Sequence, residues 1–204
     1  MMDKMASGYL QIILGPMFSG KTSKLLEIYK KYTFCNIPVL VINHSDDKRY
    51  SETEVDMMTH DKIKMNCVQS NVLLSVLDAN LEIFKKSGPL AVIVNEGQFF
   101  EDLYSTVYKM VFDYNAHVYV AGLDGDFKQE KFGQMLDLIP ICDKVFKLHA
   151  LCVKCKDGSK AIFSHRIDKK CSDQKQIGAD EAYIPLCRKC QIKEMIVGRN
   201  TESK

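Results

Sequence analysis

The sequence predicts an α/β protein in which helices lie on the faces of a parallel β-sheet, followed by a small lobe. Apolar runs typical of buried strands alternate with amphipathic segments between residues 9 and 150. A glycine-rich loop follows the first strand, in the pattern G-x-x-x-x-G-K-T. Beyond residue 150 the sequence becomes polar and turn-rich and carries two Cys-x-x-Cys pairs. We therefore expect an α/β domain at 1–150, a lobe at 151–192 and a disordered tail at 193–204.

The elements expected in the domain follow from periodicity and from the residues that end each segment. Pro38 begins the second strand, and Gly88 with Pro89 ends the second helix. In chain order we expect a strand at 9–14, a helix from Ser23 to about Phe34, a strand at 37–42, an exposed polar loop at 43–62, a short strand at 63–68, a helix at 71–86, a buried strand at 90–94, a helix at 101–114, a strand at 117–121, a short helix broken by Pro140, and a strand at 144–150.

Composition narrows the class of protein. The 204 residues are 46% apolar and carry a formal net charge of +2, as in a soluble globular protein with a substantial core. Acidic and basic residues are interspersed, which gives no reason to expect a nucleic-acid or membrane partner. Residues 1–7 lack the apolar core of a signal peptide, and no apolar run could span a bilayer. We expect a cytoplasmic protein whose eight cysteines stay reduced, which favours metal ligation for the closely spaced ones.

The glycine-rich loop fits a phosphate-binding loop (P-loop), because a strand precedes it and a helix follows it. Backbone N–H groups and the dipole of that helix would favour an anion there. We expect Lys21 to contact the β- and γ-phosphates of a nucleotide and the Thr22 hydroxyl to ligate Mg²⁺. The pattern predicts a fold of the P-loop NTPase type, the alternative being a glycine-containing turn before an ordinary helix. The predicted loop consists of Gly15, Pro16, Met17, Phe18, Ser19, Gly20, Lys21 and Thr22.

Polar residues follow the buried strand at 90–94, at the end where open α/β sheets bind ligands. Glu96 is placed there to take a proton from a nucleophilic hydroxyl. In many P-loop proteins an Asp of this second motif helps to hold Mg²⁺, whereas this chain has the neutral Asn95 beside Glu96. The alternative for Glu96 is a loop carboxylate that caps the helix starting near Asp102.

The two Cys-x-x-Cys pairs could supply four thiolates at about 2.3 Å from a tetrahedral Zn²⁺. Such closed four-cysteine sites are typically structural, and metal binding could contribute most of the folding free energy of so small a lobe. The long span between the pairs must then project from the site. The alternative is two unrelated pairs of reduced cysteines. The predicted ligands are Cys152, Cys155, Cys187 and Cys190, whereas Cys35, Cys67, Cys142 and Cys171 show no ligand spacing.

Four stretches together resemble the type II thymidine kinases, the zinc-containing deoxynucleoside kinases of vertebrates, many bacteria and large DNA viruses. They are residues 13–22, 96–100, 123–127 and 177–183, and the resemblance runs from about residue 8 to residue 190. It implies ATP-dependent transfer of the γ-phosphoryl group to the 5′-hydroxyl of thymidine, in pyrimidine deoxynucleotide salvage. We expect deoxyuridine to be a substrate as well. The resemblance also implies that the excursion between the cysteine pairs is a lasso loop over the base.

The resemblance implies roles for individual residues as well. Glu96 would be the general base, and Arg49 and Lys21 would neutralise charge on the transferred phosphoryl group. Residues implied to bind nucleotide and Mg²⁺, besides the P-loop, are Asp47, Lys48, Arg49, Asn95 and Gln98. Those implied to surround the nucleoside are Met17, Phe99, Leu123, Phe127, Phe132 and Tyr183, together with the lasso residues Gln174, Lys175, Gln176, Ile177 and Gly178.

The resemblance further implies a homotetramer and feedback inhibition by dTTP. Because the family usually has Asp at the position of Asn95, we expect weaker Mg²⁺ affinity or a lower rate, with activity retained. Gln174 and Gln176 replace apolar residues of the vertebrate members, a change that backbone recognition should tolerate.

Two other hypotheses for the function stay open. One is an ATPase that acts on nucleic acid through a zinc ribbon, which should show a basic face; the other is a catalytically impaired, nucleotide-binding regulator.

Overall fold

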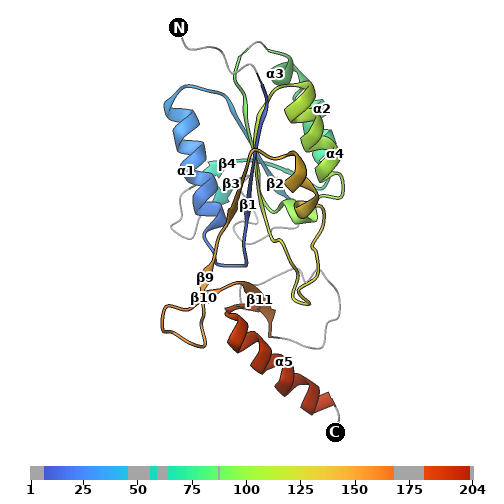
Figure 1. Cartoon of the computed structure of the whole chain (residues 1–204). Helices are drawn as coiled ribbons and strands as arrows, with labels where there is room; N and C mark the ends of the chain where they lie inside the picture. Colours follow the sequence, from blue (N-terminus) through green and yellow to red (C-terminus); the bar gives the residue numbers. More distant parts are fainter. Residues whose placement is uncertain (1–6, 46–55, 59–63, 87, 168–181, 203–204) are drawn as a thin grey trace.

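The computed structural model describes residues 7–45, 56–58, 64–86, 88–167 and 182–202, and a central β-sheet organises the chain (Figure 1). Six strands pair in the order β5-β2-β6-β7-β1-β8, and each neighbouring pair is parallel. This confirms the predicted parallel sheet. The strands are β1 (Tyr9–Leu14), β2 (Val39–His44), β5 (Val68–Ser70), β6 (Ala91–Val94), β7 (His117–Gly122) and β8 (Lys144–Lys147).

The strand sequences fit a sheet that is covered on both faces. All four residues of β6 are buried, as expected for a continuous apolar run in a parallel sheet. Along β1, Leu10 and Ile12 pack into one apolar cluster and Ile13 into another, because successive side chains point to opposite faces. The sheet therefore has two apolar cores, one on each face.

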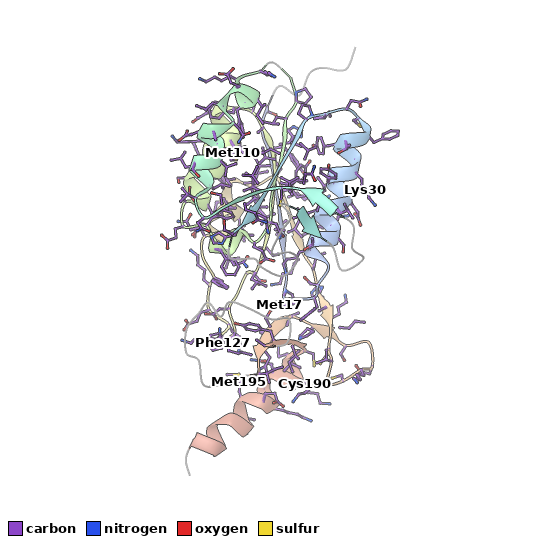
Figure 2. All side chains as sticks on the ribbon, turned by 180° about the vertical axis from the view of Figure 1, so that it is seen from behind. Met17, Lys30, Met110, Phe127, Cys190 and Met195 are labelled. Atoms are coloured by element: carbon purple, nitrogen blue, oxygen red, sulfur yellow. The ribbon has the colours of Figure 1, made fainter. Side chains whose placement is uncertain are left out.

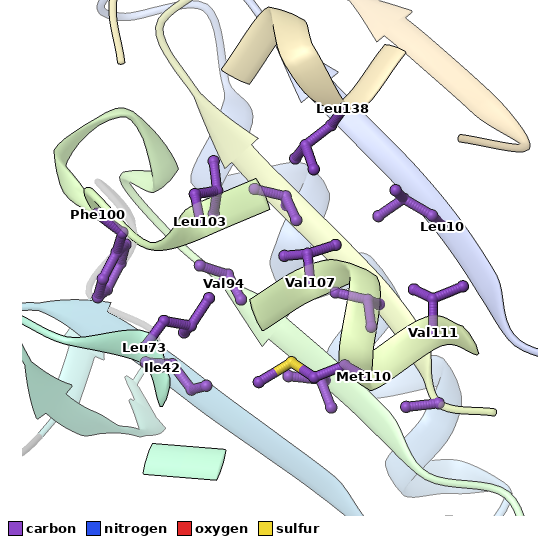
Figure 3. Packing of buried hydrophobic residues seen from close by; sticks show 14 of the residues in the cluster. Leu10, Ile42, Leu73, Val94, Phe100, Leu103, Val107, Met110, Val111 and Leu138 are labelled. Carbon is purple, nitrogen blue, oxygen red and sulfur yellow. The ribbon is translucent and has the colours of Figure 1, made fainter. Parts of the chain in front are cut away.

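The helices lie in two groups on opposite faces of the sheet (Figure 1). Helix α1 (Lys21–Phe34) covers one face, where Leu25 is fully buried. On the other face, Leu103 and Met110 point toward strand residues such as Val94 (Figure 3). The second group consists of α2 (Leu73–Ala79), α3 (Leu81–Lys85), α4 (Leu103–Tyr108) and its π-helical continuation η2 (Lys109–Asp113). The predicted helices on the sheet faces are thus confirmed.

The helix expected at 71–86 is divided in the structure. Asn80 lies between α2 and α3, and its side-chain Nδ2 donates a hydrogen bond to the carbonyl oxygen of Val76 at 2.8 Å. An asparagine that bonds the backbone in this way competes with regular helical hydrogen bonds. Similarly, Pro140 lies within the short 3₁₀ helix η3 (Met135–Ile141) and does not end it.

A small hairpin lies where the sequence predicts only a loop. Strand β3 (Asp56–Met58) falls within the polar segment 43–62 and pairs antiparallel with β4 (Lys64–Asn66). The expected strand at 63–68 is therefore two strands, β4 and the sheet strand β5. Polar residues dominate this segment, so the alternation that predicts a strand is absent from it.

The C-terminal lobe, by which we mean the described residues 150–167 and 182–202, contains two antiparallel strand pairs and one helix. Its elements are β9 (Ala150–Leu151), β10 (Lys160–Ala161), β11 (Phe163–Arg166), β12 (Tyr183–Leu186) and α5 (Arg188–Glu202). β9 pairs with β10, and β11 pairs with β12. The lobe has a small core of its own, which consists of Ala150, Cys152, Ala161, Leu186, Cys187 and Cys190.

The end of the chain differs from the disordered tail expected at 193–204. Helix α5 continues to Glu202 and extends away from the lobe (Figure 1). It is anchored at its start by Cys190 and by Gln191, which is 3% exposed and whose Oε1 accepts a hydrogen bond from Nδ1 of His165 at 3.0 Å. The polar composition that predicts disorder is also that of a solvent-exposed helix. Residues 203–204 lie outside the described part.

The carboxyl ends of the central strands meet at one edge of the sheet. Leu14 of β1 pairs with Gly122 of β7, and Val94 of β6 pairs with Val120 of β7. The segments that follow these three strands therefore lie together, as in other open parallel sheets. Among the described residues, the structure has no helix with the length and apolar character needed to cross a lipid bilayer.

Candidate functional site

The loop after β1 has the backbone of an anion-binding loop. Gly20 is in the left-handed conformation at φ 84°, immediately before α1 begins. At Gly15, with φ 156°, a Cβ atom would lie 2.7 Å from Ser19 Oγ and 2.8 Å from the Leu148 carbonyl oxygen, so the close approach requires glycine. The loop therefore brings backbone groups and the start of a helix to one point.

Lys21 turns back over this loop. Its ammonium Nζ donates hydrogen bonds to the carbonyl oxygens of Gly15 at 3.1 Å and Pro16 at 2.9 Å, and the residue is 8% exposed. Ser19 Oγ is buried, and no described residue forms a hydrogen bond with it. A buried hydroxyl without a partner costs free energy, and a phosphate oxygen would supply one. The loop thus fits a nucleotide phosphate, because it holds both the Lys21 ammonium and the Ser19 hydroxyl.

Glu96 lies at the end of β6 in a strained, buried position. It is 6% exposed, and its φ of 54° is left-handed, which is uncommon for a residue with a side chain. Gln98 donates a hydrogen bond from Nε2 to Glu96 Oε2 at 2.6 Å and accepts one at Oε1 from the Leu123 N–H at 2.9 Å. The carboxylate is therefore held by a side chain that is itself fixed by the loop after β7.

The alternative that Glu96 caps a helix is not what the structure shows. The Asp102 side chain does not cap α4, and the Tyr104 N–H in the first turn of α4 donates instead to Gln134 Oε1 at 2.7 Å. The Asp102 carboxylate instead accepts hydrogen bonds from the N–H groups of Leu73 at 3.1 Å and Leu74 at 2.7 Å, at the start of α2. Glu96 itself lies at the end of β6, at the same edge of the sheet as the P-loop.

Asn95 is buried beside Glu96 at 2% exposure. Its Nδ2 donates a hydrogen bond to Oδ1 of Asn43, at the end of the neighbouring strand β2, over 2.9 Å. Asn95 Oδ1 is buried and has no hydrogen-bond partner among the described residues. Oxygen donors are what Mg²⁺ prefers, and an amide oxygen can accept from a Mg²⁺-bound water. The donor chemistry of the Asn95 amide suits a Mg²⁺ ion, as does that of Thr22, a half-buried residue.

The aromatic residues expected around a nucleoside form two groups. Phe99 and Phe132 meet edge to face with ring centroids 5.6 Å apart, and His44 packs on Phe99 at 5.5 Å. Phe127 and Tyr183 are brought together by Arg166 of the lobe, whose guanidinium contacts both. Both groups lie next to the segments that follow β6 and β7.

The P-loop also contacts the lobe. The N–H of Met17 donates a hydrogen bond to Ser164 Oγ on β11 at 3.0 Å, and Ser164 is 5% exposed. Met17 and Phe127 lie on the side of the domain that faces the lobe (Figure 2). The structure thus places the predicted site between the sheet edge and the lobe. The predicted residues that lie outside the described part are Asp47, Lys48, Arg49, Gln174, Lys175, Gln176, Ile177 and Gly178.

Four residues at the site are not predicted from the sequence: Asn43, His44, Ser164 and Arg166. Asn43 and His44 end an ordinary apolar strand, and nothing in their local pattern separates them from loop residues. The alternation of Ser164 and Arg166 along β11 is a signal that they share a side, but four residues are too few to establish a period.

The four predicted cysteines converge in the lobe. Their sulfur atoms all lie within 4.8 Å of one another, with Cys155 Sγ 3.6 Å from Cys187 Sγ and 3.4 Å from Cys190 Sγ. Tetrahedral zinc with bonds of about 2.3 Å needs neighbouring sulfurs about 3.8 Å apart. The spacing fits zinc, so the alternative of two unrelated cysteine pairs is not supported. Cys35, Cys67 and Cys142 are not part of this cluster, and Cys171 lies outside the described residues.

The electrostatics of the cluster also favour a cation. Burial disfavours the Cys152 thiolate, but backbone N–H groups of Cys187, Cys155 and Lys154 outweigh burial and lower the pKa of the thiol to about 6. Contact with the Cys155 thiol, together with burial, raises the pKa of Cys190 to about 12. Adjacent thiols cannot all ionise unless a positive charge lies among them. The cluster therefore fits a structural zinc ion.

Comparison with known proteins agrees with this geometry. A family model described as thymidine kinase matches residues 8–191. The chain belongs to the thymidine kinase family. Thymidine kinase a of Arabidopsis thaliana is 38% identical over 198 residues, which are 96% of this chain and 80% of that protein. The thymidine kinase of fowlpox virus (strain NVSL) is 37% identical over 187 residues, 91% of this chain and 98% of the relative.

A third relative is the thymidine kinase of vaccinia virus (strain Western Reserve). It is 35% identical over 188 residues, which are 92% of this chain and 99% of the viral protein. The match therefore includes both the α/β domain and the cysteine cluster. The resemblance drawn from the sequence is confirmed.

Proposed function

We propose that this chain transfers the γ-phosphoryl group of ATP to the 5′-hydroxyl of thymidine, and of deoxyuridine, to give the nucleoside monophosphate. The observation that carries the proposal is the buried Glu96 carboxylate, held by Gln98 at the sheet edge that also carries the P-loop. Membership of the thymidine kinase family supports the choice of substrate.

In the proposed reaction, the backbone N–H groups of the P-loop and the Lys21 ammonium bind the phosphates and stabilise charge on the transferred group. Lys21 would leave the carbonyl oxygens of Gly15 and Pro16 for the phosphate oxygens. Mg²⁺, held through Thr22 and Asn95, supplies positive charge between the phosphates when it is bound. Asp47, Lys48 and Arg49 are proposed to add to this charge.

Glu96 is proposed to accept the proton of the 5′-hydroxyl as the oxygen attacks the γ-phosphorus. The bond from that phosphorus to the β,γ-bridging oxygen breaks, and ADP leaves with the bonding electrons. Gln98 would hold the carboxylate toward the hydroxyl, since its Oε1 is fixed by the Leu123 N–H. Such orientation is part of the catalytic effect, because a proton acceptor acts only within hydrogen-bond reach.

The base of thymidine is proposed to lie among Met17, Phe99, Leu123, Phe127, Phe132 and Tyr183. An apolar, aromatic site suits thymine and its methyl group. The segment Gln174, Lys175, Gln176, Ile177 and Gly178 is proposed to close over the base and to read its edge through the backbone. A structural zinc at the four cysteines would fix both ends of this segment.

We extend the proposal to the setting of the enzyme. It would act as a homotetramer in the cytoplasm and be inhibited by dTTP, which would occupy the active site. Gel filtration with light scattering tests the tetramer, and inhibition by dTTP that rises with falling thymidine concentration tests the shared site.

The deciding experiment measures ATP-dependent conversion of thymidine to its monophosphate by the wild type and by Glu96→Gln. We expect kcat of the variant to fall about 10²- to 10⁴-fold, the usual worth of a general base. Glu101→Gln is the matched control, because Glu101 is an exposed carboxylate outside the crevice and should leave kcat unchanged. Full turnover by Glu96→Gln would remove Glu96 from the role of base.

The same preparation separates the other two hypotheses. A nucleic-acid ATPase would bind single-stranded DNA with an affinity that falls steeply as salt rises. A nucleotide-binding regulator would bind ATP yet form no thymidine monophosphate at any Mg²⁺ concentration. Either result would overturn the proposed reaction.

A further inference from the structure

Arg166 is a buried cation that contacts two residues of the proposed nucleoside site. It is 4% exposed, and its guanidinium carbon lies 3.8 Å from the centroid of the Phe127 ring. Its Nε donates to the hydroxyl oxygen of Tyr183 at 3.0 Å, and its Nη2 donates to the same oxygen at 2.6 Å. One guanidinium thus uses its flat face for Phe127 and its edge for Tyr183.

This arrangement depends on the geometry of arginine. A guanidinium is planar, stacks on aromatic rings and donates two hydrogen bonds in a fixed fork, whereas an ammonium does neither. Burial of the charge makes both contacts stronger than they would be in water. The Phe127 ring and the Tyr183 hydroxyl are therefore both held by one side chain.

The contact connects the lobe to the α/β domain. Arg166 and Tyr183 face each other as paired residues of the β11–β12 hairpin, so the fold of the lobe itself brings them together. Phe127 comes from the loop after β7, which belongs to the domain. Two residues before Arg166 on the same strand, Ser164 binds the P-loop at the Met17 N–H. Strand β11 thus reaches two parts of the site through alternate side chains.

The two donated hydrogen bonds also fix what Tyr183 can offer a ligand. A phenol has one O–H donor and two acceptor lone pairs. Arg166 occupies the acceptor capacity of the Tyr183 oxygen with two donors. The Tyr183 hydroxyl can therefore form one further hydrogen bond, in which it donates its own proton.

We propose that Arg166 is a positioning residue that orients Phe127 and presents Tyr183 as a hydrogen-bond donor to the pyrimidine nucleoside. It sets the affinity for the nucleoside and leaves the affinity for ATP unchanged. The inference rests on the proposed thymidine kinase activity and assigns part of its substrate selectivity to a lobe residue outside the lasso.

The test compares Arg166→Met and Arg166→Lys with the wild type by steady-state kinetics and by calorimetric binding of thymidine. Met keeps the length of the side chain, and Lys keeps the charge without the planar fork. We expect the KM and Kd for thymidine to rise about tenfold in both variants, as for a lost charge-assisted contact. The KM for ATP and the zinc-to-chain ratio are expected to stay within twofold of wild type.

Tyr183→Phe keeps the ring and removes the oxygen that both donors share. It is expected to raise the thymidine KM as well, and adding Arg166→Met is expected to raise it by less than the product of the two single effects. If the Arg166 variants fail to fold, the thymidine KM of Tyr183→Phe alone tests the proposal. Equal effects of Arg166→Met with and without the Tyr183 hydroxyl would overturn the proposed donor role.

Arg188→Met is the matched control. Arg188 also lies over an aromatic ring of the lobe, 5.5 Å from the Phe163 centroid, but that ring is not in the proposed nucleoside site. Its thymidine KM is expected to match the wild type. A thymidine KM unchanged in Arg166→Met, or a parallel rise in both KM values with loss of zinc, would overturn the inference. A wild type without thymidine kinase activity would overturn the proposed function and this inference together.

Discussion

Asn95 and Asn43 join the ends of two neighbouring strands through a hydrogen bond of 2.9 Å between Nδ2 of the first and Oδ1 of the second. The pair is neutral and buried, so it carries no desolvated charge next to Glu96. It also fixes the Asn95 amide so that its oxygen has no partner within the described part of the chain, at the point where the proposed Mg²⁺ ion would bind.

The first prediction concerns this pair. Asn95→Asp adds a negative charge at the proposed Mg²⁺ site, and the Asn43 amide can rotate to donate to the new carboxylate. We expect a severalfold higher rate at limiting Mg²⁺ and tighter binding of Mn²⁺, measured by electron paramagnetic resonance with ADP present. No gain in either measurement would contradict the inference that the missing charge at position 95 weakens Mg²⁺ binding.

The double variant Asn43→Asp, Asn95→Asp is the matching control for this first prediction. It places two carboxylates within hydrogen-bond distance of each other, so one of them should stay protonated at neutral pH. The gain in Mg²⁺ affinity is then expected to be smaller than in the single variant. An equal gain would mean that Asn43 does not contact position 95.

Gln98 provides the second prediction. Gln98→Met keeps the volume of the side chain but removes the donor to Glu96 and the acceptor for the Leu123 N–H. We expect kcat to fall about tenfold with little change in the KM for ATP, because the carboxylate loses its orientation. Gln134→Met is the control, since Gln134 accepts from the Tyr104 N–H at 2.7 Å outside the crevice. Equal rates for the two variants would contradict the role of Gln98.

Removal of the metal is the third prediction. Cys155→Ser deletes one of the four sulfurs, and we expect less than one zinc per chain by atomic absorption and a Tm lower by at least about 5 °C. The thymidine KM should rise, because Tyr183 and Arg166 lie on the hairpin that leads into the second cysteine pair. Cys35→Ser is the control, since Cys35 is exposed and outside the cluster. A full zinc content in Cys155→Ser would exclude the four-cysteine site.

The fourth prediction concerns pH and stability. Burial lowers the pKa of His117 below its ordinary value of 6.5, nearby Asp143 opposes this shift, and Lys31 adds to it. The ring also shares a hydrogen bond of 2.8 Å with the Tyr32 hydroxyl. Because the folded pKa is below the unfolded one, the unfolded chain binds the proton more readily. Stability contributed by neutral His117 is present above pH 6.5 and is lost as pH falls through the folded pKa.

Urea unfolding between pH 7.5 and 5 measures this effect. We expect the free energy of unfolding to decrease toward pH 5 in the wild type and to decrease less in His117→Gln. His149→Gln is the control, because His149 is exposed and should leave the pH dependence as it is in the wild type. A pH dependence unaltered by His117→Gln would rule out His117 as its source.

Local patterns account for what could be predicted from the sequence. The P-loop, the end of β6 at Glu96 and the cysteine pairs are each set by residues a few positions apart, and each pattern has a chemical reason. The parallel sheet follows from apolar runs that alternate with amphipathic helices. These features depend little on the remainder of the chain.

The contacts that could not be predicted join residues far apart in sequence. Met17 and Ser164 are separated by 147 positions, and Asn43 and Asn95 by 52. Neither member of such a pair carries a local signal for the other. The helix α5 was missed for a different reason, since exposed helices and disordered tails share a polar composition.

The left-handed backbone at Glu96 lowers the stability of the fold at a residue that the proposed reaction uses. A glycine there would relieve about 1 kcal/mol of conformational strain and remove a buried charge, so Glu96→Gly is expected to resist urea at least as well as Glu96→Gln. In the proposed reaction the same change would remove the proton acceptor, so we expect kcat to fall at least as far as in Glu96→Gln. Stabilisation of this protein by consensus or computation would therefore favour replacing a residue that the proposed reaction needs.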